Sequence, residues 1–191
     1  MIRAEALSRS FGTKHVLRGL DFEVAERDCL LVTGPNGSGK STLLALCAGL
    51  LAPTGGSLQV SVERGELGYL AHEPLLYREL TALENLDLYG RLYRVPERRE
   101  RIGRLLERFR LWEARHERVG SFSRGMTQRL ALCRVLLHEP RLLLLDEPYS
   151  GLDAEAAELV DEVLSEGRTF VVATHNPDRV PGHVHQELVL A

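Results

Sequence analysis

Three glycines, one lysine and two serines lie together in a short segment whose chemistry suits phosphate. The segment reads GPNGSGKST from position 34, and Gly34, Gly39, Lys40 and Ser41 have the spacing G-x4-G-K-[ST]. A turn of this kind between a strand and a helix offers backbone N–H groups and the positive end of the helix to an anion. The spacing predicts a phosphate-binding loop, against the alternative of a glycine-rich turn without a ligand.

The residues on either side of this segment favour the phosphate loop. The apolar run at 30–33 is typical of a buried strand, and helical periodicity begins after the loop. The apolar side chains expected on one side of that helix are Leu43, Leu44, Cys47 and Leu50. The missing side chains of the glycines leave room for phosphate oxygens, Lys40 supplies a mobile charge, and Ser41 a hydroxyl for Mg²⁺.

A second group of candidate residues follows a run of four leucines. The segment RLLLLDEP predicts a buried parallel strand whose carboxyl end presents Asp146 and Glu147 at the ligand-binding edge of an α/β sheet. Asp146 is expected to hold Mg²⁺ through water, and Glu147 to accept a proton from the water that attacks a γ-phosphate. Acids here can instead cap a helix. However, Pro148 follows at once, and two adjacent acids on a buried strand are costly without a cation.

A further strand is predicted over the segment RTFVVATH, residues 168–175, and it ends on His175. From the residues alone, a histidine after a strand is more often an ordinary loop residue than a catalytic one.

The order of these segments along the chain resembles the ATP-binding subunits of ABC transporters. Phe11 and the segments GPNGSGKST, FSRGMTQRL, LLLLDEP, SGLD and TH follow one another as in that family and extend over nearly the whole chain. The resemblance implies one α/β domain over 1–191 with the P-loop fold of ABC type. It further implies a central, mainly parallel sheet with helices on both faces, an N-terminal antiparallel β subdomain, and a helical subdomain inserted at about 74–135.

The resemblance also implies cofactors and roles for individual residues. ATP and Mg²⁺ are the implied cofactors, and the implied catalytic residues are Lys40, Glu147 and His175. The residues implied to contact nucleotide are Phe11, Gly34, Pro35, Asn36, Gly37, Ser38, Gly39, Lys40, Ser41, Thr42, Ser123, Gly125 and Asp153. Ser41 and Asp146 are implied at the metal and His175 at the γ-phosphate, while Phe11 would stack on adenine, which requires only a flat ring.

The segment FSRGMTQRL, residues 122–130, is the family's signature segment. In the family, two nucleotide subunits associate head to tail and each presents this segment to the ATP of the other, so a second copy of this chain is an expected partner. Ser123 and Gly125 would offer a hydroxyl, backbone N–H groups and a helix N-terminus to the γ-phosphate, and Asp153 would cross the dimer interface. Arg124 replaces a glycine of the common form L-S-G-G-Q, and either adds charge near the phosphates or points to solvent.

The chain has no glutamine at the position that links the metal site to the membrane partner in the family. Within LGYLAHEPLLYRELTALENL, His72 or Glu73 stands there, depending on the alignment, and we favour His72. A glutamate would add negative charge beside Mg²⁺, whereas a histidine would add a pH-sensitive donor or ligand.

Between the phosphate loop and the signature segment, the chain carries an amphipathic, arginine-rich stretch. In RRERIGRLLERFRLW, the apolar residues predicted on one helical face are Ile102, Leu105, Leu106, Phe109 and Trp112, so Trp112 is predicted in the core. The ten Arg and five Glu at 91–118 could form a nucleic-acid or lipid patch. Interleaved charges more often form a solvated, paired face, and no nucleic acid is expected as a partner.

Composition limits the class of protein. The chain has 191 residues, 44% of them hydrophobic, and carries a net charge of −3, which fits one globular unit. No apolar run is long enough to span a membrane, and the N-terminus does not resemble a secretory leader. Three separated cysteines, Cys29, Cys47 and Cys133, indicate buried thiols in a reducing compartment. Lys14 and Lys40 are the only lysines, which makes both conspicuous.

The resemblance to ABC transporter subunits implies an ATPase that energises export through a separate integral membrane subunit, located in the cytoplasm on the inner face of the cell membrane. The ATPase subunit of the haem exporter of cytochrome c maturation is the most similar group, on the segments LTALENL and FSRGMTQRLALCRVLLHEPRLLLLDEP. The ATPases of drug, polysaccharide or lipid exporters share much of this pattern. A soluble, non-transport ABC ATPase acting on nucleic acid, ribosome or an assembly scaffold is the alternative.

Overall fold

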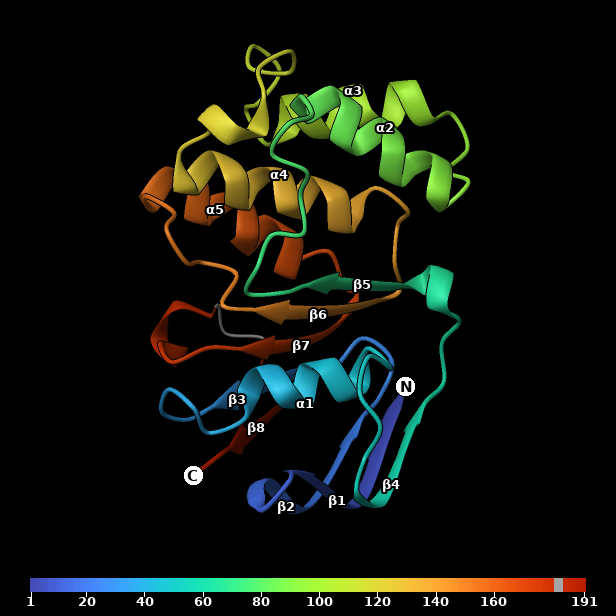
Figure 1. The fold of residues 1–191 in the computed structure, drawn as a ribbon, viewed down its shortest axis with the longest axis vertical. Helices are drawn as coiled ribbons and strands as arrows, with labels where there is room; N and C mark the ends of the chain where they lie inside the picture. Colours follow the sequence, from blue (N-terminus) through green and yellow to red (C-terminus); the bar gives the residue numbers. More distant parts are fainter. Residues whose placement is uncertain (181–183) are drawn as a thin grey trace.

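A computed structural model of the chain describes residues 1–180 and 184–191. In chain order, its strands are β1 (Ile2–Phe11), β2 (Lys14–Val24), β3 (Cys29–Thr33), β4 (Gly55–Val60), β5 (Leu67–Leu70), β6 (Leu142–Asp146), β7 (Thr169–Ala173) and β8 (Gln186–Val189). Its α-helices are α1 (Lys40–Cys47), α2 (Ala82–Leu92), α3 (Arg98–Arg108), α4 (Arg124–Leu136) and α5 (Ala154–Leu164). Figure 1 shows these elements in layers, with α2 and α3 lying over α4.

Five strands form a parallel sheet in the order β5-β6-β7-β3-β8. Every residue of β3, β6 and β7 is buried, which explains why these strands appear in the sequence as continuous apolar runs rather than alternating ones. Because the strands are parallel, their carboxyl ends meet at one edge, where ligands of α/β proteins bind. The predicted central parallel sheet is confirmed.

An antiparallel sheet in the order β2-β1-β4 packs beside the parallel sheet, and Figure 1 shows it next to α1. The register of β1 shifts after Ala4 on one side and after Glu5 on the other, and Ala6 has a φ of 46°. The backbone N–H of Ala6 donates to the Asp21 carboxylate at 2.8 Å, so the irregular strand remains hydrogen-bonded. This sheet is the predicted N-terminal β subdomain.

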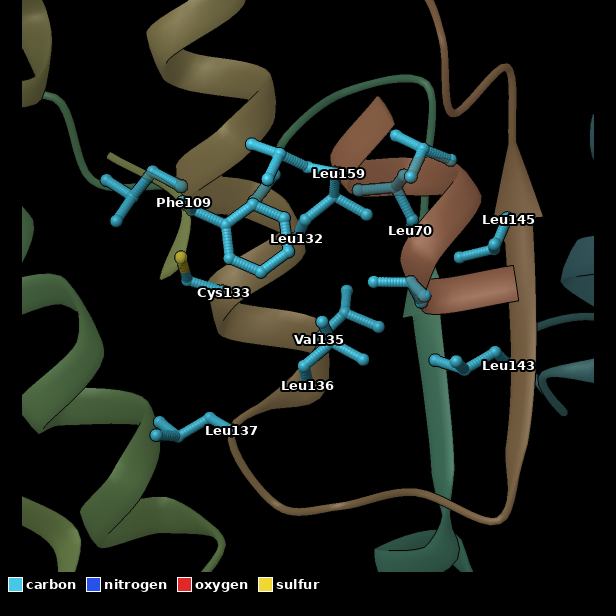
Figure 2. Close-up of a cluster of buried hydrophobic side chains, with 14 of the residues drawn as sticks. Leu70, Phe109, Leu132, Cys133, Val135, Leu136, Leu137, Leu143, Leu145 and Leu159 are labelled. Atoms are coloured by element: carbon cyan, nitrogen blue, oxygen red, sulfur yellow. The ribbon is translucent and has the colours of Figure 1, made fainter. Parts of the chain in front are cut away.

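Side chains of the parallel strands alternate between two hydrophobic cores. Leu143 and Leu145 of β6 face the layer formed by α2 to α5, whereas Leu142 and Leu144 face α1 and the antiparallel sheet. Figure 2 shows the first core, where Leu143 and Leu145 lie beside side chains of α4. The sheet is thus covered on both faces, as predicted.

The segment after β5 supplies the helices α2, α3 and α4, and its hydrogen bonds fix the start of α2. Thr81 caps α2 in a capping box with Glu84. The buried Asn85 accepts from the Tyr77 N–H at 2.8 Å and donates to the Tyr77 carbonyl at 3.0 Å, which fastens the preceding loop to the helix.

Two predictions from helical periodicity are wrong. Helix α3 ends at Arg108 and the chain turns at Arg110, with a φ of 54°. Trp112 therefore lies outside the helix, 37% exposed, with the Arg115 guanidinium 4.2 Å from the centre of its ring. Helix α1 likewise ends before Leu50, which is 65% exposed.

Five of the ten arginines at 91–118 form ion pairs in the described part of the chain, four of them with acids outside their own helix: Arg91, Arg98, Arg101, Arg108 and Arg110. Arg98 of α3 pairs with Asp87 of α2 at 2.6 Å, and Arg108 pairs with Glu166, after α5, at 2.5 Å. The predicted paired face is therefore confirmed for these five arginines, and exposed pairs of this kind each contribute about 0–1 kcal/mol to stability.

All three cysteines are buried and free, as predicted. Burial raises the pKa of the Cys29 thiol to about 11 and that of Cys47 to about 12, so both are neutral near pH 7. Within the residues that the structure describes, none of the helices is long and apolar enough to cross a membrane.

Candidate nucleotide site

A cavity of about 700 Å³ opens at the carboxyl end of the parallel sheet. It brings together residues from the antiparallel sheet, the phosphate loop, the ends of β6 and β7, and the start of α4. The cavity is lined by Phe11, Lys14, Val16, Asn36, Gly37, Gly39, Lys40, Ser41, Thr42, His72, Arg124, Asp146, Glu147, Ser150 and His175. Eleven of these fifteen residues were predicted from the sequence.

The phosphate loop connects β3 to α1, as expected, but its glycines are needed for two different reasons. A Cβ on Gly34 would lie 2.3 Å from the Leu190 carbonyl oxygen, and one on Gly39 2.8 Å from a Leu17 methyl group, so neighbouring protein fills both places. Gly37 has a φ of 86°, and a Cβ there would meet no described atom within 4 Å, so only its backbone conformation requires glycine. Gly34, Pro35 and Ser38 belong to the loop without lining the cavity.

Lys40 is fixed in place and is not the mobile charge that the sequence suggested. Its ammonium group donates to the carbonyl oxygens of Gly34 at 2.7 Å and Pro35 at 3.0 Å, and the residue is 7% exposed. An ammonium group has three protons, so one donor remains for a ligand. The charge therefore sits at a defined point at the start of α1.

Asp146 is the last residue of β6 and is 3% exposed. Burial raises the pKa of its carboxyl group above the ordinary value, against the opposing effects of the Ser41 hydroxyl and of His72. One carboxylate oxygen, Oδ2, is buried without a hydrogen-bond partner among the described residues. A carboxylate of this kind is stabilised by a cation.

Glu147 has a strained backbone and an oriented side chain. Its φ is 50°, in the left-handed region. Its Oε1 accepts from the His175 backbone N–H at 2.9 Å and lies 2.8 Å from His175 Nδ1, while Oε2 accepts from the Thr174 hydroxyl at 3.0 Å. Glu147 does not cap a helix, because the next one, α5, is capped by Asp153.

The two alternatives for the missing glutamine occupy different places. His72 lines the main cavity together with Ser41 and Asp146. Glu73 is absent from this cavity and lines two adjoining ones, the first of which it shares with His72 and Asp146. The geometry favours His72 over Glu73 because only His72 lines the same cavity as both Ser41 and Asp146.

Four lining residues were not predicted at this site, or were left undecided. Lys14 and Val16 lie at the start of β2 next to Phe11, which is 46% exposed and has the Arg9 guanidinium 4.4 Å from the centre of its ring. The signal that pointed to Lys14 was the rarity of lysine, since both lysines of the chain line this cavity. Ser150 begins the segment SGLD, but no role was predicted for it, and Arg124 reaches the cavity from the signature segment.

Three further predicted residues lie outside the cavity of their own chain. Ser123 caps α4, accepting from the Met126 N–H at 3.2 Å, and Gly125 lies in the first turn of the same helix. Asp153 caps α5, accepting from the Ala156 N–H at 2.8 Å. Both caps are exposed at the surface of the chain, where a second molecule could contact them.

Comparison with known proteins decides the family. The sequence profile of the ABC transporter family matches residues 17–150. The chain belongs to the ABC transporter family. This ABC protein is 42% identical over 159 residues to the uncharacterized ABC transporter ATP-binding protein YxlF of Bacillus subtilis, covering 80% of the chain and 54% of that relative. It is 38% identical over 184 residues to the Nod factor export ATP-binding protein I of Rhizobium sp., covering 88% and 60%.

Solved structures confirm that the fold is that of an ABC-type ATPase domain. An ATP-binding subunit of an ABC transporter superimposes with a TM-score of 0.88 at 28% identity, covering all of this ABC chain and 85% of the other. The dimeric, post-hydrolysis structure of the cassette MJ0796 bound to ADP and Pi gives 0.85 at 26% identity, covering all of this chain and 94% of the other. The chain spans little more than half the length of the curated relatives it matches.

Proposed function

We propose that this ABC protein binds and hydrolyses ATP to energise export through a separate membrane subunit. The observation that carries the proposal is the cavity in which a phosphate loop, Lys40 and the carboxyl end of β6 converge. In this proposal, residues 1–191 form one nucleotide-binding domain, with the helical subdomain inserted at about 74–135.

The phosphate loop binds and orients the triphosphate. Backbone N–H groups of the loop and the positive end of α1 attract the phosphate oxygens, and α1 has no acid in its first turn to oppose them. The third N–H of the Lys40 ammonium group donates a charge-assisted hydrogen bond to the β- and γ-phosphates. Phe11 offers one ring face for stacking on adenine, since Arg9 packs against the ring.

The chain's residues fit a divalent cation beside the phosphates. Asp146 supplies a buried carboxylate oxygen that no described residue hydrogen-bonds, Ser41 a hydroxyl, and His72 an imidazole nitrogen at the same cavity. When bound, Mg²⁺ would neutralise phosphate charge. We propose these three residues, with Ser41 and Asp146 as the main pair, as those that hold it.

Glu147 is proposed as the base that accepts a proton from the attacking water. Hydrogen bonds from Thr174 and the His175 backbone hold both carboxylate oxygens at the mouth of the cavity. The His175 side chain, 62% exposed, is proposed to contact the γ-phosphate on the side away from Glu147. A carboxylate fixed in this way needs little reorganisation before proton transfer.

A second copy of the chain is proposed to complete the site in a head-to-tail dimer. Ser123 and Gly125 stand at the N-terminus of α4, which suits a partner's γ-phosphate, and Asp153 lies at the same surface. The support from relatives is that a similar cassette was solved as a dimer with ADP and Pi.

The membrane subunit is proposed to dock on the loop that follows His72. This loop exposes the apolar side chains of Leu75 (47%) and Tyr77 (55%), as expected of a surface that a partner covers. The chain would then be cytoplasmic and peripheral on the inner face of the membrane. Relatives named as transporter ATPases favour this over a soluble ABC ATPase acting on nucleic acid, ribosome or a scaffold.

For the cargo, we propose a molecule other than haem, with a Nod factor as the first candidate to test. Several relatives, with 33 to 38% identity, are named for Nod factor export. Haem export for cytochrome c biogenesis rests on the resemblance of short segments alone.

The substitution Glu147→Gln tests the hydrolytic part of the proposal. We expect the MgATPase rate of the purified chain to fall about 100-fold or more, while ATP binding measured by calorimetry is kept and ATP traps a dimer visible by size-exclusion chromatography. The matched control, Glu158→Gln on the exposed face of α5, should hydrolyse ATP at the normal rate. Unchanged turnover in Glu147→Gln would remove this residue from the role of base.

A further inference from the structure

Arg124 folds back onto the segment that follows β6, although the residue itself remains exposed. Its Nη2 donates to the Ser150 hydroxyl oxygen at 2.7 Å. Its Cγ and Cδ occupy the space next to Gly151, where a Cβ would lie 2.8 Å from both atoms. Gly151 has a φ of 76°, so this turn both requires glycine and accommodates the arginine.

Two neighbouring residues of α4 contact the same segment, which spans Glu147 to Asp153. Gln128 donates through Nε2 to the carbonyl oxygens of Pro148 at 3.1 Å and Glu147 at 3.4 Å. At Gly125, a Cβ would lie only 3.1 Å from the Gly151 carbonyl oxygen. One side of the first two turns of α4 therefore rests on this segment.

Of these three contacts, only the one made by Arg124 involves a charged side chain. Among the described residues it has no ion-pair partner, although Asp146 and Glu147 line the same two cavities. Its hydrogen bond to Ser150 directs the guanidinium to the turn rather than to these acids. Arg124 therefore contacts the segment that carries Glu147, from the position at which the common signature has a glycine.

The two ends of this connection belong to different nucleotide sites in the proposed dimer. Glu147 acts in the site of its own chain, whereas Ser123 and Gly125 face the nucleotide of the partner. A movement of the segment that carries Glu147 would be transmitted to the start of α4, within the signature segment, through the hydrogen bond between Arg124 and Ser150.

We infer that Arg124 is a positioning residue that fastens the segment Glu147–Asp153 to the start of α4, so that the base of one site and the signature turn serving the other move together. This inference rests on the proposed ATP hydrolysis by a dimer. It assigns a role to the departure from the common signature, where a glycine has no side chain to make such a connection.

A double-mutant cycle tests the connection. We expect Arg124→Ala and Ser150→Ala each to lower kcat for MgATP about three- to ten-fold, the rate equivalent of one hydrogen bond, with KM and calorimetric ATP affinity unchanged. The double variant should be no slower than either single variant, because both remove one interaction. Arg124→Lys, which can still donate to Ser150, should recover most of the rate.

Hydrogen exchange separates a failure of this inference from a failure of the proposed function. Amides of 147–153 should exchange about three- to ten-fold faster in both single variants, whether or not the chain hydrolyses ATP. Arg104→Ala, which changes an exposed arginine of α3, should leave exchange and kcat as in the wild type. Unchanged exchange at 147–153, independent effects in the double variant, or weaker ATP binding in Arg124→Ala alone would each overturn the inference, the last by making Arg124 a phosphate contact.

Discussion

At the residue scale, Asp146 combines a proposed functional role with an energetic cost. Its Oδ2 is buried, and no residue in the described part of the chain hydrogen-bonds it; an unsatisfied buried acceptor costs about 1–3 kcal/mol. The folded-state pKa lies above the ordinary value of 3.8, so the folded chain holds the proton more tightly than the unfolded chain. The contribution of Asp146 to the free energy of unfolding therefore decreases as the pH rises from the ordinary pKa through the raised, folded-state pKa.

Replacing Asp146 with Asn should therefore stabilise the chain when Mg²⁺ and nucleotide are withheld. We expect the free energy of unfolding, from urea denaturation at pH 8 with EDTA, to rise by about 1 kcal/mol. The difference should shrink as the pH falls toward the raised pKa of this carboxyl group, where the aspartic acid also becomes neutral. With MgATP the order should reverse, since only the carboxylate pairs with the cation. A variant less stable than wild type at pH 8 in EDTA would contradict this account.

At the scale of elements, the C-terminus of α3 separates a core aromatic from a surface one. Phe109 caps α3 and is fully buried beside α4, as Figure 2 shows, whereas Trp112 is 37% exposed three residues later. Phe109→Ala should lower the free energy of unfolding by about 3–5 kcal/mol. The matched control Trp112→Ala should cost about 1 kcal/mol or less, measured by urea denaturation. Equal losses would place Trp112 back in the core.

The same elements explain what the sequence could predict. Strands β3, β6 and β7 are buried on both faces, so each appears in the sequence as a continuous apolar run. The end of each run marks where the candidate site residues begin. Periodicity could not predict where α1 and α3 stop, because Gly49 and Arg110 end them with positive φ values. For the same reason Leu50 and Trp112 were misplaced.

Some site residues could likewise be predicted from the sequence, whereas others could not. Asp146 and Glu147 could be predicted because they stand where the apolar run of β6 ends. Lys40 could be predicted from the spacing of the phosphate loop that precedes α1. Ser150 was missed because its place depends on a turn around Gly151 that Arg124 covers. The undecided pair His72 and Glu73 was separated only by the direction of the loop after β5.

At the scale of the whole molecule, the proposed site needs two copies of the chain. Ser123 and Asp153 lie outside the cavity of their own chain, so the ATPase rate per chain should rise with protein concentration. We expect an approximately linear rise at low concentration, measured from nanomolar to micromolar chain. Ser123→Arg should abolish the rise but keep ATP affinity in calorimetry. A rate per chain that stays constant down to verified monomer would refute the shared site.

The floor of the phosphate loop comes from a distant part of the sequence. The Leu190 N–H donates to the Thr33 carbonyl at 2.8 Å, and the Leu190 carbonyl fills the space next to Gly34. Residues about 150 positions apart thus shape one loop. Since chains emerge from the ribosome N-terminus first, the first 180 residues of a nascent chain contain every proposed phosphate ligand yet lack this support. Competence to capture nucleotide is therefore expected only after residues 186–190 have emerged, when the strand at 186–189 joins the sheet.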